Sequence, residues 1–104
     1  MRIQFNTDKT IKGSDRAQEY FSEVILKELD RFQAHITTVE VHLSDQNGKK
    51  EGFNDIKCLL EARLEGKKPI AVSALANNVE LALSGALGKL KASLDTILGR
   101  LKNH

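Results

Sequence analysis

The chain contains 104 residues, of which 40% are hydrophobic and 29% are charged, and its formal net charge is +2. A chain of this length buries one core, so we expect a single folded domain over residues 1–104. No apolar run reaches the roughly 20 residues that span a bilayer, and the N-terminal segment lacks the apolar core of a signal peptide. The sequence therefore predicts a cytoplasmic protein without a membrane partner.

The cysteine and histidine content argues against a disulfide framework and against a metal site. Cys58 is the single cysteine, which excludes an internal disulfide and fits a reducing compartment. The histidines, His35, His42 and His104, are scattered and lack the spacing of metal ligands. We therefore expect neither a metal nor a cofactor.

The first third of the chain predicts a strand followed by a helix. In residues 2–6, Ile3 and Phe5 alternate with polar residues, as in a strand with one solvent-exposed face. From about residue 15 to residue 32, apolar residues recur at helical spacing. They form one stripe, which consists of Ala17, Tyr20, Phe21, Val24, Ile25, Leu29 and Phe32.

Three strands and a long helix make up the rest of the predicted fold. Apolar and polar residues alternate in residues 38–44, 56–64 and 70–75, and the short loops between these segments favour an antiparallel meander. The last helix is predicted from about residue 78 to residue 102, with Asn77 and Glu80 as a capping pair. Its apolar stripe consists of Val79, Leu83, Ala86, Leu87, Leu90, Leu94, Ile97, Leu98 and Leu101.

This order of elements, β-α-β-β-β-α, predicts the α+β fold class. Each strand has one apolar face and each helix one apolar stripe, so both helices should pack on the same face of one four-stranded sheet. The other face should remain exposed to solvent, with Gln4, Glu40, His42, Lys57 and Arg63 on it.

Basic residues follow the flanks of both predicted helices. Arg16, Lys27 and Arg31 share one flank of the first helix. On the last helix, Lys89 and Arg100 share one flank, and Lys91 and Lys102 share the other. If the helices lie side by side, the groove between them presents the first set against one of these two pairs, and the sequence leaves open which. Such a groove would fit a phosphate backbone, although bases beside an apolar stripe are also the ordinary border of a surface helix.

Small residues form a narrow sector of the last helix that we expect to lie opposite the core. The sector contains Leu81, Gly85, Gly88, Ala92 and Gly99. A glycine inside a helix costs about 1 kcal/mol relative to alanine. Either this face lets the backbone of a protein or RNA partner approach closely, or it is an exposed surface on which the choice of residue is only loosely constrained.

The residues needed for catalysis do not converge in the predicted fold. Cys58 lies on an inward strand face, where a small core residue is expected. His42 lies on the exposed face beside Glu40 and Lys57, without a nucleophile. We therefore expect a protein that is not an enzyme and has no small-molecule substrate.

Several segments resemble the ribosome hibernation-promoting factor and ribosome-associated inhibitor family. The matching segments are RIQFNTDKTI at residues 2–11, LKELDRF at 26–32, TTVEVHLS at 37–44 and ALSGALGKLKASL at 82–94. The resemblance covers nearly the whole chain, and its specificity lies in the order of the segments. Ala92 stands where the family usually has a base.

This resemblance implies binding to the small ribosomal subunit through rRNA, near the sites of messenger and transfer RNA. The implied outcome is inhibition of translation and ribosome hibernation under stress. Lys27, Arg31, Lys89 and Lys91 lie at or near the family's basic positions. With the other flank residues, the expected rRNA-binding set is Arg16, Lys27, Arg31, Lys89, Lys91, Arg100 and Lys102.

Two other functions remain as alternatives. The first is a protein-interaction module that has kept the fold but no longer binds the ribosome. Its contact surface would be the glycine face of the last helix or the exposed Leu59 and Leu75. The sequence also leaves open whether the chain forms a weak homodimer. The second is a double-stranded RNA-binding domain, which shares the order helix, three strands, helix. That domain carries lysines at the start of its last helix, whereas residues 76–82 contain no base.

Overall fold

The computed structural model describes residues 1–7, 15–45 and 55–102, except for the side chains of Asp15 and residues 100–102. Its elements are β1 (Arg2–Thr7), α1 (Asp15–Glu28), the 3-10 turn η1 (Asp30–Phe32), β2 (Ile36–Asp45), β3 (Ile56–Leu64), β4 (Ile70–Ala76) and α2 (Val79–Lys102). The predicted order β-α-β-β-β-α and the α+β fold class are confirmed.

The strands form one sheet in the order β1-β2-β3-β4. β2, β3 and β4 are antiparallel neighbours, which confirms the predicted meander, with Val41 opposite Leu60 and Leu60 opposite Val72. β1 pairs with β2 in parallel, with Ile3 opposite Val39. The parallel pairing is possible because α1 carries the chain back along the sheet between these two strands.

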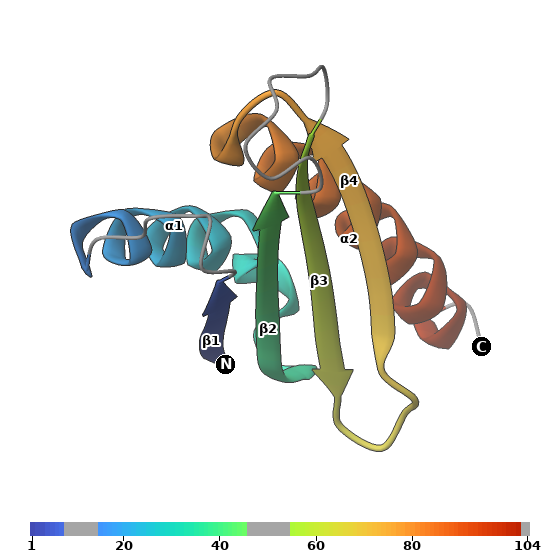
Figure 1. Cartoon of the computed structure of the whole chain (residues 1–104). Coiled ribbons are helices and arrows are strands. Elements are labelled where there is room, and N and C mark those ends of the chain that lie inside the picture. Colours follow the sequence, from blue (N-terminus) through green and yellow to red (C-terminus); the bar gives the residue numbers. More distant parts are fainter. Residues whose placement is uncertain (8–14, 46–54, 103–104) are drawn as a thin grey trace.

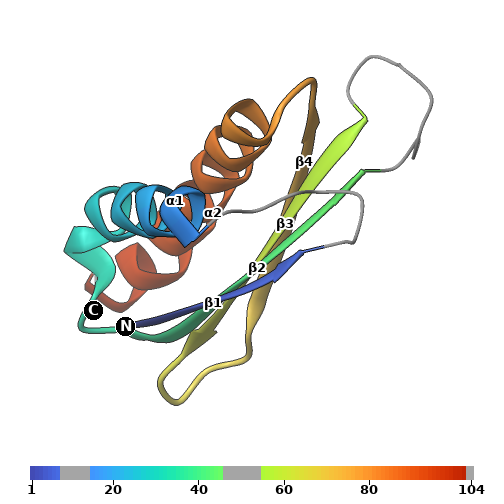
Figure 2. The ribbon, with the colours of Figure 1, turned by 60° about the vertical axis from the view of Figure 1, so that its left-hand side comes forward.

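Both helices cover the same face of the sheet (Figures 1 and 2). α2 packs against β3 and β4, and α1 lies toward the β1 and β2 side. The buried strand residues follow the predicted inward alternation, because a sheet covered on one side buries every second side chain. The exception is Ile36, which precedes the predicted strand and lies at a register shift between Ile36 and Thr38. The core consists of Ile25, Leu29, Phe32, Ile36, Val39, Val41, Leu43, Cys58, Leu60, Ala62, Leu64, Ala82, Leu83, Ala86, Leu87, Leu90, Leu94 and Leu98.

The first helix ends earlier than its apolar stripe predicts. The α-helix stops at Glu28, and the Phe32 amide then donates to the Leu29 carbonyl at 2.9 Å in a 3-10 turn. The tighter turn still carries Phe32 into the core. Toward the other end of the stripe, Tyr20 is 51% exposed, so it lies at the edge of the stripe and not in the core.

The second helix is capped by Asn78 rather than by the predicted Asn77. The Leu81 amide donates to the Asn78 side-chain oxygen at 2.8 Å, which satisfies one of the free amides of the first helical turn. The helix therefore begins at Val79, one residue later than the sequence suggested.

The glycine sector of α2 does not lie wholly opposite the core. A Cβ on Gly85 would be 3.1 Å from the Cβ of Ala74 on β4, so this glycine lets α2 approach the sheet closely. A Cβ on Gly88 or Gly99 would meet nothing within 4 Å. Gly85 is exposed as expected, but it lies at the border with β4 rather than opposite the sheet.

This difference predicts opposite effects of two substitutions. Gly88→Ala should raise the free energy of unfolding by about 0.5–1 kcal/mol, because it removes backbone entropy from the unfolded chain at an open site. Gly85→Val should lower it by about 1–3 kcal/mol, because the new side chain overlaps β4. Urea denaturation measures both values, and equal effects at the two positions would contradict this packing.

Candidate functional site

Two hollows lie along the line where α1 and η1 face α2, which we call the helix seam. The larger, about 370 Å³, is lined by Tyr20, Phe21, Val24, Glu28, Glu80, Leu83, Ser84, Leu87, Gly88 and Lys91. The smaller, about 130 Å³, is lined by Arg31, Phe32, His35, Asp95, Leu98 and Gly99. Charged residues from both helices therefore meet at the seam, above an apolar floor.

Lys91 and Glu28 form an ion pair across the seam. The Lys91 ammonium donates a hydrogen bond to the Glu28 carboxylate, which links α2 to the last turn of α1. This hydrogen bond and the positive charge of Lys91 hold the pKa of Glu28 below its usual value. Both side chains remain in contact with solvent, at 33% and 44% exposure.

Arg31 and Asp95 form a second pair across the seam, near the end of η1. Two guanidinium nitrogens of Arg31 meet the two carboxylate oxygens of Asp95 at 2.8 and 3.0 Å. This is the bidentate geometry that suits a planar guanidinium. The guanidinium carbon also lies 4.3 Å from the centre of the Phe32 ring, a cation–π contact.

Lys89 points away from the seam. Its ammonium donates to the backbone carbonyl of Ser73 on β4 at 2.7 Å. The flank of α2 that faces α1 is therefore that of Lys91, and the flank of Lys89 faces β4. Of the two arrangements that the sequence left open, the structure has the one with Lys91.

The remaining predicted bases differ in how far the structure describes them. Arg16 and Lys27 are exposed on α1. The side chains of Arg100 and Lys102 lie outside the part of the structure that is described. The predicted set is thus divided between two flanks of α2 and does not form a single described trough.

The carboxylates of the seam were missed by the sequence analysis, although a signal was present. Asp95 follows Lys91 by four residues and Glu28 precedes Arg31 by three, so each acid shares a helical flank with a predicted base. Counting acids as well as bases on these flanks would have predicted a nearly balanced seam rather than a positively charged one.

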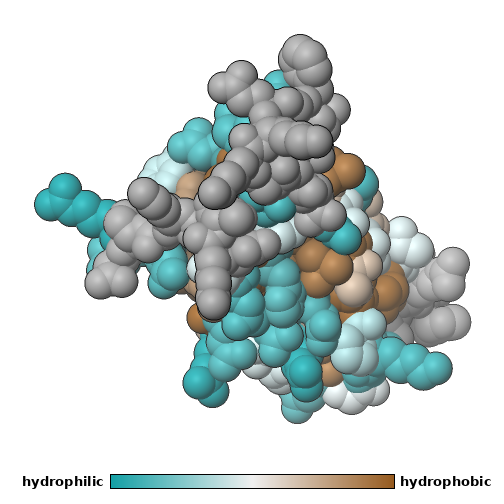
Figure 3. All heavy atoms as spheres, in the orientation of Figure 1, coloured by the Kyte–Doolittle hydropathy of each residue, from teal (hydrophilic) through white to brown (hydrophobic). Residues whose placement is uncertain are grey.

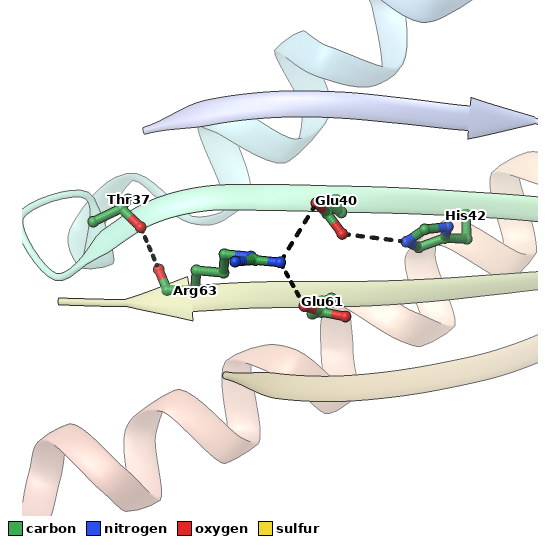
Figure 4. Close-up of polar contacts among 5 residues, drawn as sticks. All are labelled: Thr37, Glu40, His42, Glu61 and Arg63. Carbon is green, nitrogen blue, oxygen red and sulfur yellow. Dashed lines mark hydrogen bonds and ion pairs between the residues drawn. The ribbon is translucent and has the colours of Figure 1, made fainter. Parts of the chain in front are cut away.

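The face of the sheet opposite the helices carries a second group of charged residues (Figure 4). One Arg63 guanidinium nitrogen lies 3.9 Å from Glu40 and 3.6 Å from Glu61, and His42 lies 3.6 Å from Glu40. Arg63 thus screens two carboxylates that face each other across β2 and β3. Toward β4, hydrophobic side chains are visible on this face (Figure 3), and Leu75 is 55% exposed.

Within the described residues, no group of three or more histidine, cysteine or acidic side chains is arranged to hold a metal ion. None of the described helices combines the length and the apolar character needed to cross a bilayer.

Cys58 is fully buried, and burial raises the pKa of its thiol to about 12. The reactive thiolate is therefore scarce at neutral pH. We predict that iodoacetamide leaves Cys58 unmodified in the native protein at pH 7.5 and alkylates it fully in urea, as measured by mass spectrometry. Complete alkylation under native conditions would contradict this placement.

Comparisons with known proteins agree with the family resemblance. A model of the family described as Sigma 54 modulation protein / S30EA ribosomal protein matches residues 5–102. A search of curated proteins finds no match.

Two solved structures share the fold. The crystal structure of the Thermus thermophilus Protein Y N-terminal domain aligns with a TM-score of 0.73 at 21% identity, covering 93% of this chain and 99% of that chain. A ribosomal subunit interface protein from Coxiella burnetii aligns with a TM-score of 0.73 at 17% identity, covering 95% of this chain and 99% of that chain. Since the family model spans residues 5–102, the chain belongs to the Sigma 54 modulation protein / S30EA ribosomal protein family.

Proposed function

We propose that this protein binds the small ribosomal subunit through rRNA and inhibits translation by occupying the sites of messenger and transfer RNA. The observation that carries the proposal is the family match over residues 5–102. The fold shared with a ribosomal subunit interface protein supports it. The protein would act in the cytoplasm during stress, by steric occlusion rather than by catalysis, and without a cofactor.

The proposed contact surface is the helix side of the molecule. Arg16 and Lys27 are exposed on α1, and Arg31 and Lys91 lie at the seam with part of each side chain open to solvent. Lysine and arginine at these positions would neutralise rRNA phosphates and release condensed counterions. The proposed set also includes Lys89, which is exposed on the other flank of α2, and the bases Arg100 and Lys102, whose side chains lie outside the described part of the structure.

The test is co-sedimentation with purified small subunits at rising salt. The proposal expects pelleting at low salt that falls steeply as the salt concentration rises, because counterion release drives the association. A protein that stays in the supernatant even at low salt would refute ribosome binding.

A protein-interaction module with this fold is the second candidate, and two observations favour it. The seam cations are bound by carboxylates, and Leu75 and Leu81 are 55% and 56% exposed. Partner capture from a ribonuclease-treated extract distinguishes the candidates, because a protein partner survives this treatment. A partner that is lost on Leu75→Ser would support this alternative.

A further inference from the structure

The two basic side chains of the seam, Arg31 and Lys91, are already paired with carboxylates. Asp95 holds Arg31 through two contacts of 2.8 and 3.0 Å, and Glu28 holds Lys91. In each pair, the acid and the base come from opposite sides of the seam. Two of the bases that we propose to contact rRNA, Arg31 and Lys91, are therefore paired with acids within the free protein.

A carboxylate and a phosphate engage these bases in the same way. The planar guanidinium group donates two parallel hydrogen bonds to either anion, and an ammonium attracts either anion as a point charge. A phosphate can therefore take the place of Asp95 or Glu28 only by displacing it, or by sharing its base.

The exposure of both pairs permits such an exchange. The Arg31 and Asp95 side chains are 61% and 52% exposed, so solvent and ions reach the pair directly. Exposed ion pairs stabilise a folded protein only weakly, and a polyanion that offers many phosphates readily exceeds this contribution. Neither pair is buried in a way that would make its opening costly.

The structure also has room for the incoming anion beside Arg31. The hollow of about 130 Å³ lies against Arg31, Asp95 and Gly99, and a Cβ on Gly99 would meet nothing within 4 Å. Arg31 could keep its contact with the Phe32 ring, 4.3 Å away, while its nitrogens turn from Asp95 to a phosphate.

We propose that Asp95 and Glu28 compete with RNA phosphates for Arg31 and Lys91 and thereby lower the affinity for the ribosome. The inference rests on the proposed function and names its regulation: the two acids act as internal substitutes for phosphate. Their removal should tighten binding rather than weaken it.

The experiment compares two variants with equal charge changes. One is Asp95→Asn with Glu28→Gln. The control is Glu23→Gln with Glu65→Gln, since Glu23 lies beside β1 and Glu65 lies in the turn after β3, both away from the seam. Small-subunit affinity is measured by sedimentation at several salt concentrations, and thermal unfolding checks that each variant folds.

The seam variant should bind about tenfold more tightly than the control variant, with each released base contributing a few-fold. If wild type binds and the seam variant binds no more tightly than the control, the competition is refuted and the proposed function stands. If no protein pellets at any salt concentration, the proposed function itself fails.

A double-mutant cycle separates competition from a positioning role of Asp95. Under competition, Arg31→Ala costs more affinity in the Asp95→Asn background than in wild type, because Arg31 is then fully available to phosphate. If Asp95 instead orients Arg31 for RNA, Arg31→Ala costs less in that background. The second result would overturn the proposal even if net affinity rises.

Discussion

Replacing Arg16, Lys27, Arg31 and Lys91 together by glutamine is expected to weaken small-subunit binding by about 100-fold at moderate salt. That loss corresponds to about 2.7 kcal/mol, which is modest for four charge-assisted contacts because the seam pairs offset part of it. The plot of log affinity against log salt should also become shallower by about three. Sedimentation over a salt series measures both changes.

The control for this variant removes the same charge elsewhere. Arg2, Lys57, Lys67 and Lys68 lie on β1, on β3 and in the turn before β4, and their replacement by glutamine should leave most of the affinity. An equal loss in both variants would mean that overall charge, and not the helix side, determines binding.

Leu90→Ala is expected to lower the free energy of unfolding by about 2–5 kcal/mol. Leu90 is fully buried on the face of α2 that packs against the sheet, so the substitution removes apolar contacts and leaves a cavity. For a domain whose total stability is about 5–15 kcal/mol, this is a large fraction. Urea denaturation followed by circular dichroism measures the change.

Leu81→Ala is the matched control, since it makes the same change on the same helix at a residue that is 56% exposed. We expect a change within about 0.5 kcal/mol. A comparable destabilisation by both variants would contradict the packing of α2.

The strands could be assigned from the sequence because a sheet covered on one side requires apolar and polar residues to alternate along each strand. The alternation of Val39, Val41 and Leu43 with polar neighbours admits only one orientation of β2. The place of β1 did not follow, because the pattern of Ile3 and Phe5 reports a buried face and not the neighbouring strand.

Helix boundaries and the exposure of Tyr20 depended on tertiary structure. An apolar stripe continues through an α-helix and a 3-10 turn alike, so Phe32 extended the predicted helix past its true end at Glu28. Tyr20 belongs to the stripe by phase, but it lies at the open edge of the larger hollow.

The candidate site was predictable in location but not in charge balance. Helical phase placed Arg31 and Lys91 on flanks that could face each other, and the structure brings them to the same seam. Helical phase alone could not show whether the flank of Lys89 or that of Lys91 faces α1, because this depends on the orientation of α2 about its own axis relative to β4. The pairing with Asp95 and Glu28 required distances between helices that no linear pattern contains.

Hydroxyl-radical footprinting of small-subunit rRNA reports directly whether the protein occupies the sites of messenger and transfer RNA. At a concentration that just saturates the subunit with wild-type protein, we expect protection of the rRNA backbone where messenger and transfer RNA bind. At the same concentration, the variant lacking Arg16, Lys27, Arg31 and Lys91 should lose most of that protection. An unchanged cleavage pattern, or protection confined to another region of the subunit, would contradict the proposed function.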